Sequence, residues 1–456
     1  MFAKKLYIWG TMIYALIVVT SLLIGSILWN MALIKANRLS RKEIAVVKKA
    51  MEEMAKSLRK TTTVPVSAAL PAPANPIMAE PEADKNRHLL KRKVLALIDK
   101  YRKHELELED LPAFQDEMKR FFDSQPKEPY YKLLDLRYEK KDRRVVVIGD
   151  THCDFKSFAG IMEKLSLSEY DYFENAWFVF LGDYLDRGRI LFENLAVLMG
   201  FKQLLEDRCI FLKGNHELIE YDASKAMLMS MVHPANTCPT LNEYCGGDKE
   251  FLRKFADYFS NLPYYVLLKT QRGTDLLVHG GIARDVYMDK FTISHDTGEM
   301  LVSGGAAIRA NVLNNMIWGD PRTDRRKIQG SSSRFEFGRD QFEEFATINK
   351  IDRIFRSHEP VRNGVASFYD GRLFTVFSNG GFGNDDSNYG EVLNPVFCII
   401  GADGSERFES IFFKRVTARR GSSEFSTLTY MEGSAADVEM RLDDLHMNNE
   451  FFVINQ

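Results

Sequence analysis

Eight short apolar runs lie between residues 143 and 404, separated by loops or by stretches with helical spacing. The runs are RRVVVIGD, WFVFLGD, CIFLKGN, YYVLLKT, DLLVHGG, RIFRSHE, RLFTVFS and VFCIIGADG. Strands with one wet face alternate apolar and polar residues, whereas runs as continuously apolar as these suit strands that are buried on both faces and covered by helices. The sequence therefore predicts an α/β (layered α+β) fold with its sheets in the interior.

Five of the runs lead into polar side chains where we expect strands to end. These side chains are Asp150 and His152 after the first run, Asp183, Asp186 and Arg187 after the second, Asn215 and His216 after the third, His279 after the fifth and His358 after the sixth. Loops at the ends of buried strands are where such folds place ligands, because a rigid sheet can hold several side chains around one point.

Six of these residues have donor atoms that suit Zn, Fe or Mn: Asp150, His152, Asp183, Asn215, His279 and His358. Any one of the motifs alone would be ordinary loop chemistry, but four of the nine histidines fall in four separate motifs of this kind. Six ligands are enough for two divalent ions if one carboxylate bridges them. Two ions about 3.5–4 Å apart can activate a water and hold both oxygens of an in-line displacement, which suits phosphate esters.

Three neighbouring residues have the chemistry to complete such a site. His216 adjoins Asn215 but cannot easily point the same way, so we expect it to act as a general acid for the leaving oxygen. Asp186 is placed to hold that imidazole in its working tautomer. The guanidinium of Arg187 suits a two-pronged contact with phosphate.

The motifs GDTH, GDYLDRG, GNHE, HGG and RSHE occur in the order found in the calcineurin-like metallophosphoesterases. More narrowly, the chain resembles the PPP-type serine/threonine protein phosphatases over roughly residues 90–410. Further similarity lies in FFDSQPKEPYYKLL (121–134), NLPYYVLL (261–268), WGDP (318–321), RFEFG (334–338) and FSNGGFG (377–383).

This resemblance implies a central two-sheet β-sandwich flanked by helices. It implies that Asp150, His152 and Asp183 hold one metal ion, and that Asp183, as the bridge, holds the other together with Asn215, His279 and His358. It further implies direct attack of a metal-bound hydroxide on phosphoserine or phosphothreonine, with His216 as the acid, Asp186 orienting it and Arg187 binding phosphate.

The sequence departs from the family pattern at three positions near the site. Cys153 stands where the family typically has glycine. Ungapped matching puts Ser331 at the second phosphate-binding arginine, with Arg334 and Arg326 as the alternatives. Phe382 falls where a tyrosine hydroxyl often reaches the site. Arg334, Phe382 and Arg356 of the RSHE motif are therefore our further candidates for substrate binding.

Residues 6–34 contain no charged residue and would rise about 43 Å as a helix, more than a bilayer core needs. We expect residues 1–5 to be a short leading segment, 6–34 a transmembrane anchor, 35–60 a basic juxtamembrane helix and 61–84 a Pro/Ala-rich tether. The phosphoesterase domain is expected at 85–420, with residues 85–140 helical, and a C-terminal tail at 421–456. Six Lys and Arg residues follow the span and two precede it, so the domain should face the cytoplasm.

The leading functional hypothesis is a membrane-anchored, metal-dependent phosphoprotein phosphatase. The alternatives are a hydrolase of small phosphoesters, such as dinucleoside polyphosphates, and a catalytically inactive membrane scaffold. The net charge of −2 argues against nucleic acid as the main partner. The insert at residues 221–247 should border the cleft, with its Met and aromatic side chains serving packing or a peptide groove. Cys153 is expected to be either a redox-sensitive thiol or a small residue tolerated at a turn.

Overall fold

The computed structural model describes residues 88–103, 106–139, 142–323, 334–381, 384, 386–411, 413–420 and 423–430. The predicted anchor, juxtamembrane helix and tether lie outside these residues, as does Phe382. Within the described part, no helix has the length and apolar content needed to cross a membrane.

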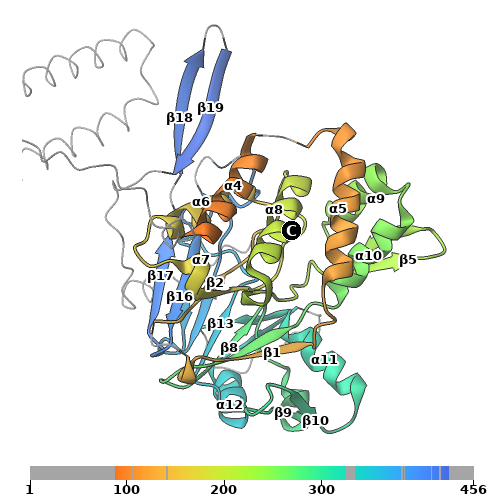
Figure 1. Ribbon diagram of the computed structural model, residues 1–456. Helices are drawn as coiled ribbons and strands as arrows, with labels where there is room; N and C mark the ends of the chain where they lie inside the picture. Colours follow the sequence, from red (N-terminus) through yellow and green to blue (C-terminus); the bar gives the residue numbers. More distant parts are fainter. Residues whose placement is uncertain are drawn as a thin grey trace, which may run out of the picture. The chain divides into compact units, whose positions relative to one another are not determined.

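Two sheets form the centre of the domain (Figure 1). The first has five strands in the order β17 (Glu406–Ser410), β16 (Val396–Gly401), β2 (Arg144–Ile148), β3 (Ala176–Phe180) and β4 (Cys209–Phe211). The second has six strands in the order β1 (Tyr131–Asp135), β7 (Tyr265–Lys269), β8 (Thr274–Val278), β13 (Arg353–Arg356), β15 (Leu373–Val376) and β14 (Val365–Phe368). All eight predicted runs are strands of these sheets.

The apolar runs supply side chains to both faces of each sheet. In β2, Val145 and Val147 join a buried cluster shared by the two sheets, whereas Val146 and Ile148 pack in the cluster formed with the helices. Because successive side chains of a strand point to opposite faces, a run without polar residues is what a strand between two apolar layers requires. The α/β expectation and the two-sheet sandwich are therefore confirmed.

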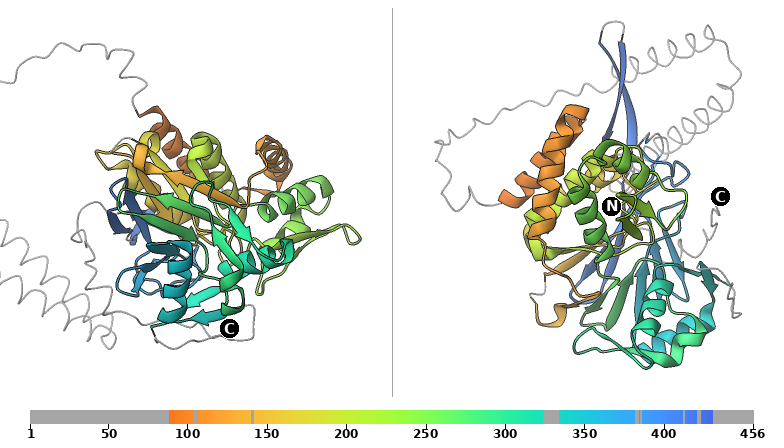
Figure 2. Two further views of the ribbon diagram at one scale, coloured as in Figure 1. Left: turned by 90° about the horizontal axis from the view of Figure 1, so that it is seen from below. Right: turned by 90° about the vertical axis from the view of Figure 1, so that its right-hand side faces the viewer.

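Helices cover the outer faces of both sheets (Figure 2). The cluster beside the five-stranded sheet includes residues of α4 (Leu89–Lys103), α5 (Leu111–Ser124), α6 (Phe155–Ser166), α7 (Tyr172–Asn175), α8 (Leu191–Leu205), α9 (Thr237–Cys245) and α10 (Lys249–Ser260). The cluster beside the six-stranded sheet includes residues of α11 (Ala306–Met316) and α12 (Arg339–Asn349). The described 3-10 turns are η1 (Leu108–Asp110), η2 (Leu136–Tyr138), η3 (Glu206–Arg208) and η4 (Asp285–Lys290).

Four two-stranded ribbons complete the described elements. They pair β5 (Ile219–Asp222) with β6 (Met227–Ser230), β9 (Phe291–Ile293) with β10 (Met300–Val302), β11 (Gly319–Pro321) with β12 (Phe335–Phe337), and β18 (Phe413–Arg420) with β19 (Ser423–Tyr430). The last pair differs from the expected tail, which we began at residue 421. Residues 423–430 are mostly polar and do not indicate a strand by themselves. Their strand conformation depends on pairing with β18, which the sequence of this segment alone does not predict.

The expectation that residues 85–140 are helical is only partly correct. Helices α4 and α5 account for its first part, but residues 131–135 form β1, which pairs in parallel with β7 from Tyr131 opposite Tyr265. The short apolar stretch YYKLL fits both periodicities. Its pairing with a strand more than a hundred residues later decides the outcome.

Candidate metal centre

The predicted ligands meet at one edge of the two sheets because their strands are parallel. Strands β2, β3 and β4 run parallel, so the loops with Asp150, Asp183 and Asn215 leave at the same edge. Strands β8 and β13 are also parallel, and they lead into His279 and His358. All six predicted ligands are buried.

The carboxylate of Asp183 lies between two groups of donors. Its Oδ2 is 3.4 Å from Nε2 of His152, and its Oδ1 is 3.4 Å from Nε2 of His279. Nε2 of His152 is also 3.6 Å from Oδ2 of Asp150. Asp183 is thus the residue shared by two clusters of potential ligands, one around His152 and one around His279 and His358.

Backbone carbonyls fix which ring nitrogen of two histidines faces the centre. Nδ1 of His152 lies 2.7 Å from the carbonyl oxygen of Leu185, and Nδ1 of His279 lies 3.0 Å from that of Leu181. A carbonyl oxygen only accepts, so each Nδ1 must carry the proton and each Nε2 presents a lone pair. This is the tautomer that a metal ligand needs.

Several lone pairs then face one another with no proton to share. Nε2 of His279 lies 2.9 Å from Oδ1 of Asn215 and 3.1 Å from Nδ1 of His358. Oδ2 of Asp150 and Nε2 of His358 are buried and have no hydrogen-bond partner among the residues that the structure describes. Orphaned acceptors in a buried site are costly unless a cation satisfies them, so the donor set fits divalent metal ions.

The electrostatics of the site also favour positive charge. Burial lowers the pKa of His152, but the carboxylates of Asp150 and Asp183 outweigh it and raise that pKa to about 9. Burial likewise opposes ionisation of Asp183, yet His279 and the other imidazoles hold its pKa well below the usual range. The carboxylates that raise the pKa of His152 also attract a metal ion, which would take the place of a proton on Nε2.

Left-handed backbone places many of these side chains. Asp183, His152 and His358 have φ of +56°, +41° and +73°, and Asp186 and Arg187 have +65° and +68°. Such conformations cost free energy for residues other than glycine and cluster at functional sites. Where the turn is tightest glycine is required, because a Cβ on Gly214 would lie 2.2 Å from Oδ1 of Asp183.

His216 is oriented from both its backbone and its ring. Its N–H donates to Oδ1 of Asp183 at 3.0 Å, and its Nδ1 lies 2.7 Å from Oδ2 of Asp186. The other oxygen of Asp186 accepts from the backbone N–H groups of Asn236 and Thr237 at 3.0 and 2.8 Å. These two residues belong to the insert at 221–247, which therefore borders the site as expected and fixes the Asp186 carboxylate.

The sequence profile of the Calcineurin-like phosphoesterase family matches residues 143–362, which include all six ligand candidates and His216. Residues 143–362 form a calcineurin-like phosphoesterase domain. Human serine/threonine-protein phosphatase 5 is 28% identical over 248 residues, which are 52% of this chain and 43% of the relative. The chain thus spans less than half the length of that relative.

Two further relatives have similar names. The serine/threonine-protein phosphatase 4 catalytic subunit of Eremothecium gossypii is 26% identical over 238 residues, covering 52% of this chain and 69% of the relative. A solved protein serine/threonine phosphatase from Saccharomyces cerevisiae, described as similar to human phosphatase PP5, matches with a TM-score of 0.47 and 22% identity. That match covers 65% of this chain and 83% of the solved chain.

Glu217 connects two loops of the phosphoesterase domain, a role we did not predict. Its buried carboxylate accepts hydrogen bonds from the backbone N–H groups of Asp183 and Tyr184 at 2.8 Å and of Gly214 at 2.9 Å. Burial and the neighbouring Asp183 raise its pKa to about 8. Glu217 is the last residue of the GNHE motif. It is not among the ligand candidates, and the three backbone donors around its carboxylate explain its place in the motif.

Tyr389 is a second residue that the sequence did not reveal. Its ring stacks on that of His152, with centroids 5.3 Å apart. Burial raises the pKa of its hydroxyl, and nearby Arg187 opposes that rise. The resemblance of SNGGF to the family's segment points instead to Phe382, seven residues earlier, which lies outside the described residues.

The loop that carries Tyr389 is tied to the first two motifs. The Nδ2 of Asn384 donates to both carboxylate oxygens of Asp154 at 2.9 and 3.0 Å. The Nδ2 of Asn388 donates to the carbonyl oxygen of Arg187. Tyr389 is thus held beside His152 by side chains at either end of one loop.

The two arginine candidates have different environments, and one prediction is wrong. Arg356 is fully buried: its Nη2 lies 2.9 Å from Oδ1 of Asp320, its Nη1 3.2 Å from Oε2 of Glu359, and its Nε donates to the carbonyl of Gly280. With its donors engaged inside the protein, Arg356 is not available to substrate. Arg334 is 43% exposed and contacts Oδ2 of Asp320 through Nε at 2.6 Å, so its guanidinium reaches the surface.

Cys153 occupies a position at which the backbone favours glycine. Its φ is +54°, and its side chain is buried with Sγ 3.4 Å from the carbonyl oxygen of Tyr184. Burial, with the acidic neighbours Asp186 and Glu217, raises the thiol pKa well above its usual value. The environment therefore favours the second expectation, a small residue accommodated at a turn.

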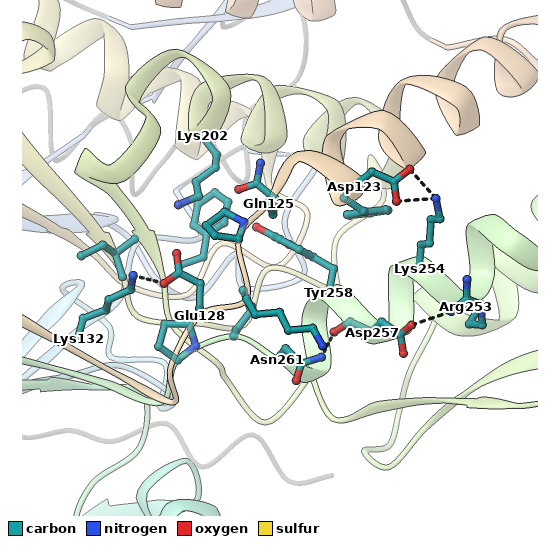
Figure 3. A pocket seen from close by; sticks show the side chains of 17 residues that line it. Asp123, Gln125, Glu128, Lys132, Lys202, Arg253, Lys254, Asp257, Tyr258 and Asn261 are labelled. Carbon is teal, nitrogen blue, oxygen red and sulfur yellow. Dashed lines mark hydrogen bonds and ion pairs between the residues drawn. The ribbon is translucent and has the colours of Figure 1, made fainter. Parts of the chain in front are cut away.

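A separate pocket lies away from the metal centre, between α5, α8 and α10 (Figure 3). It has a volume of about 340 Å³ and contains none of the strand-end residues. Ion pairs such as Lys254 with Asp123 and Lys132 with Glu128 occupy its walls. These charged side chains are engaged with one another and do not converge on a common point as the strand-end residues do. We therefore assign the chemistry to the strand ends and not to this pocket.

Proposed function

We propose that this chain is a metal-dependent phosphoprotein phosphatase that hydrolyses phosphoserine and phosphothreonine monoesters. The observation that carries the proposal is the position of Asp183 between His152 and His279, with the His216–Asp186 pair beside it. The PPP-type relatives support this substrate class, and the buried donor set supports the metal dependence.

The metal ions would be held as the motif order suggests. Asp150, His152 and Asp183 would hold one ion, and Asp183 would hold the second with Asn215, His279 and His358. When bound, two divalent ions (Mn, Fe or Zn) would activate a water nucleophile and neutralise the charge of the phosphate.

The chain's own side chains would bind the ester and move the proton. Arg187 has a buried Nε without a hydrogen-bond partner in the described part of the chain, and we assign its guanidinium to phosphate binding. Arg334 reaches the surface beside Asp320 and would supply the second cationic contact. His216 would donate a proton from Nε2 to the leaving oxygen while Asp186 accepts from its Nδ1 and stabilises the imidazolium.

We further propose that residues 6–34 anchor the chain in a membrane with the phosphoesterase domain in the cytoplasm. The uncharged length of that segment and the excess of cationic residues after it support this arrangement. Alkaline carbonate extraction of cells expressing the full chain tests the anchor. Retention in the membrane pellet is expected, and release into the soluble fraction would contradict it.

A substrate panel tests the phosphatase proposal. The purified full chain, supplied with Mn²⁺, should hydrolyse phosphoserine and phosphothreonine peptides with higher kcat/KM than dinucleoside polyphosphates. Hydrolysis of the small phosphoesters alone would establish the alternative substrate class. Inactivity on every substrate, in protein shown to contain metal, would favour an inactive scaffold.

A further inference from the structure

The insert that borders the proposed catalytic acid presents two methionine side chains to solvent. Met229 and Met231, on or directly after β6, are 39% and 60% exposed. Leu228 and Val232, which alternate with them, are buried. Among the exposed large hydrophobic residues of the described chain, no other two are so close in sequence. Met229 and Met231 are thus not core residues, in contrast to the simpler of the two expectations for this insert.

The backbone connects this surface to the catalytic pair at both ends. The N–H of Met231 donates to the carbonyl oxygen of Leu218, two residues after His216, at 3.0 Å. Five residues further on, Asn236 and Thr237 donate to the Asp186 carboxylate. The Oδ1 of Asn236 also accepts from the N–H of Arg187 at 2.9 Å. The segment between Met231 and Thr237 therefore borders the proposed site directly.

The backbone groups at the free edge of β6 are partly hydrogen-bonded within the protein. A partner would therefore meet the exposed Met side chains and not an open strand edge. The side chain of Asn242, on α9, accepts from the N–H of Leu228 at 2.8 Å and donates to its carbonyl oxygen at 2.9 Å. A partner that added a strand to this edge would have to displace these bonds. The ribbon of β5 and β6 packs against α9 and α10 (Figure 1).

We propose that Met229 and Met231 form a docking surface for apolar residues that flank the phosphorylated residue of a polypeptide substrate. The inference rests on the proposed phosphatase function and narrows its substrate class. A methionine surface suits varied flanking sequences because unbranched, polarizable side chains adapt to different partners. A small phosphoester has no flanking residues to place on this surface.

The test uses the full chain and three substrates. The double variant Met229→Gln/Met231→Gln keeps side-chain length but removes apolar surface, and Leu301→Gln, on an exposed strand of the six-stranded-sheet side, is the matched control. The substrates are p-nitrophenyl phosphate, a phosphoserine peptide with Leu and Phe flanks, and one with Gly and Ser flanks. The double variant should lower kcat/KM about tenfold for the apolar-flanked peptide, mainly through KM, and leave the other two within twofold.

The remaining outcomes separate the two proposals. If wild-type protein hydrolyses no phosphopeptide, the proposed function fails. If it hydrolyses both peptides but the double variant changes neither, only the docking surface is overturned. An equal fall for all three substrates would indicate damage to the site. An equal rise would indicate that another segment of this chain covers the surface. Either result would overturn the docking proposal.

Discussion

Nδ1 of His216 lies 2.7 Å from Oδ2 of Asp186, and the pair joins two motifs 30 residues apart in the chain. The second oxygen of Asp186 is occupied by backbone donors from the insert, so the carboxylate cannot rotate away. An imidazole held in this way keeps its proton on Nδ1 and leaves Nε2 for the proton transfer that we propose. The insert therefore helps to hold the proposed catalytic acid in place.

Asp186→Asn should lower kcat about 100-fold for phosphoserine peptides, because the amide no longer stabilises the protonated imidazole. The loss should be much smaller for p-nitrophenyl phosphate, whose leaving group needs little protonation. Steady-state kinetics on both substrates measures the difference. Equal losses would show that Asp186 acts on the architecture of the site and not through the proton on His216.

Arg356→Met should destabilise the fold, because it leaves the carboxylates of Asp320 and Glu359 buried without their shared partner. Breaking a buried ion pair in this way typically costs about 3–5 kcal/mol of unfolding free energy. Arg334→Gln removes a half-exposed contact and should cost below about 1 kcal/mol, while raising KM for phosphopeptides several-fold. Urea unfolding and steady-state kinetics on both variants provide the comparison. A stable Arg356→Met variant with a raised KM would restore the original assignment of Arg356 to substrate.

These two arginines show what the sequence can and cannot determine. The strand-end motifs identified the six ligand candidates. The hydrophobic pattern predicts where each strand ends, and parallel pairing then places those ends at one edge of the sheets. The use of a guanidinium depends instead on burial and on which carboxylates the tertiary fold brings within reach. Arg356 is the last residue of a strand, yet Asp320, Glu359 and the carbonyl oxygen of Gly280 engage its guanidinium.

The roles of Glu217 and Tyr389 could not be predicted from the sequence, because they too depend on tertiary contacts. Backbone donors of Asp183 and Tyr184, in a loop more than thirty residues away, define the role of Glu217 together with the nearby N–H of Gly214, and a stacked ring defines that of Tyr389. The Asp183 loop and the His152 ring are distant in sequence, so no periodicity or spacing indicates these contacts. Cys153 is the converse case: the departure from glycine was visible, and its φ of +54° explains why glycine is usual there.

Glu217→Gln should destabilise the chain by about 1–3 kcal/mol, because the amide turns one of its accepting oxygens into a donor that faces a backbone N–H. The matched control is Glu220→Gln on the exposed ribbon, which should be nearly neutral. Thermal or urea unfolding measures both. A neutral Glu217→Gln variant would contradict the role of this carboxylate in holding the loops of Asp183 and Gly214 together.

We propose that Asp183 joins two metal sites in one catalytic centre. The most direct measurement is metal content per chain, by mass spectrometry on the full-length protein loaded with Mn²⁺, for wild type and Asp183→Asn alongside phosphopeptide hydrolysis. We expect two ions in the wild type, a loss of at least one in the variant, and a fall in kcat of roughly a thousandfold. A variant that keeps both ions and full activity would contradict it.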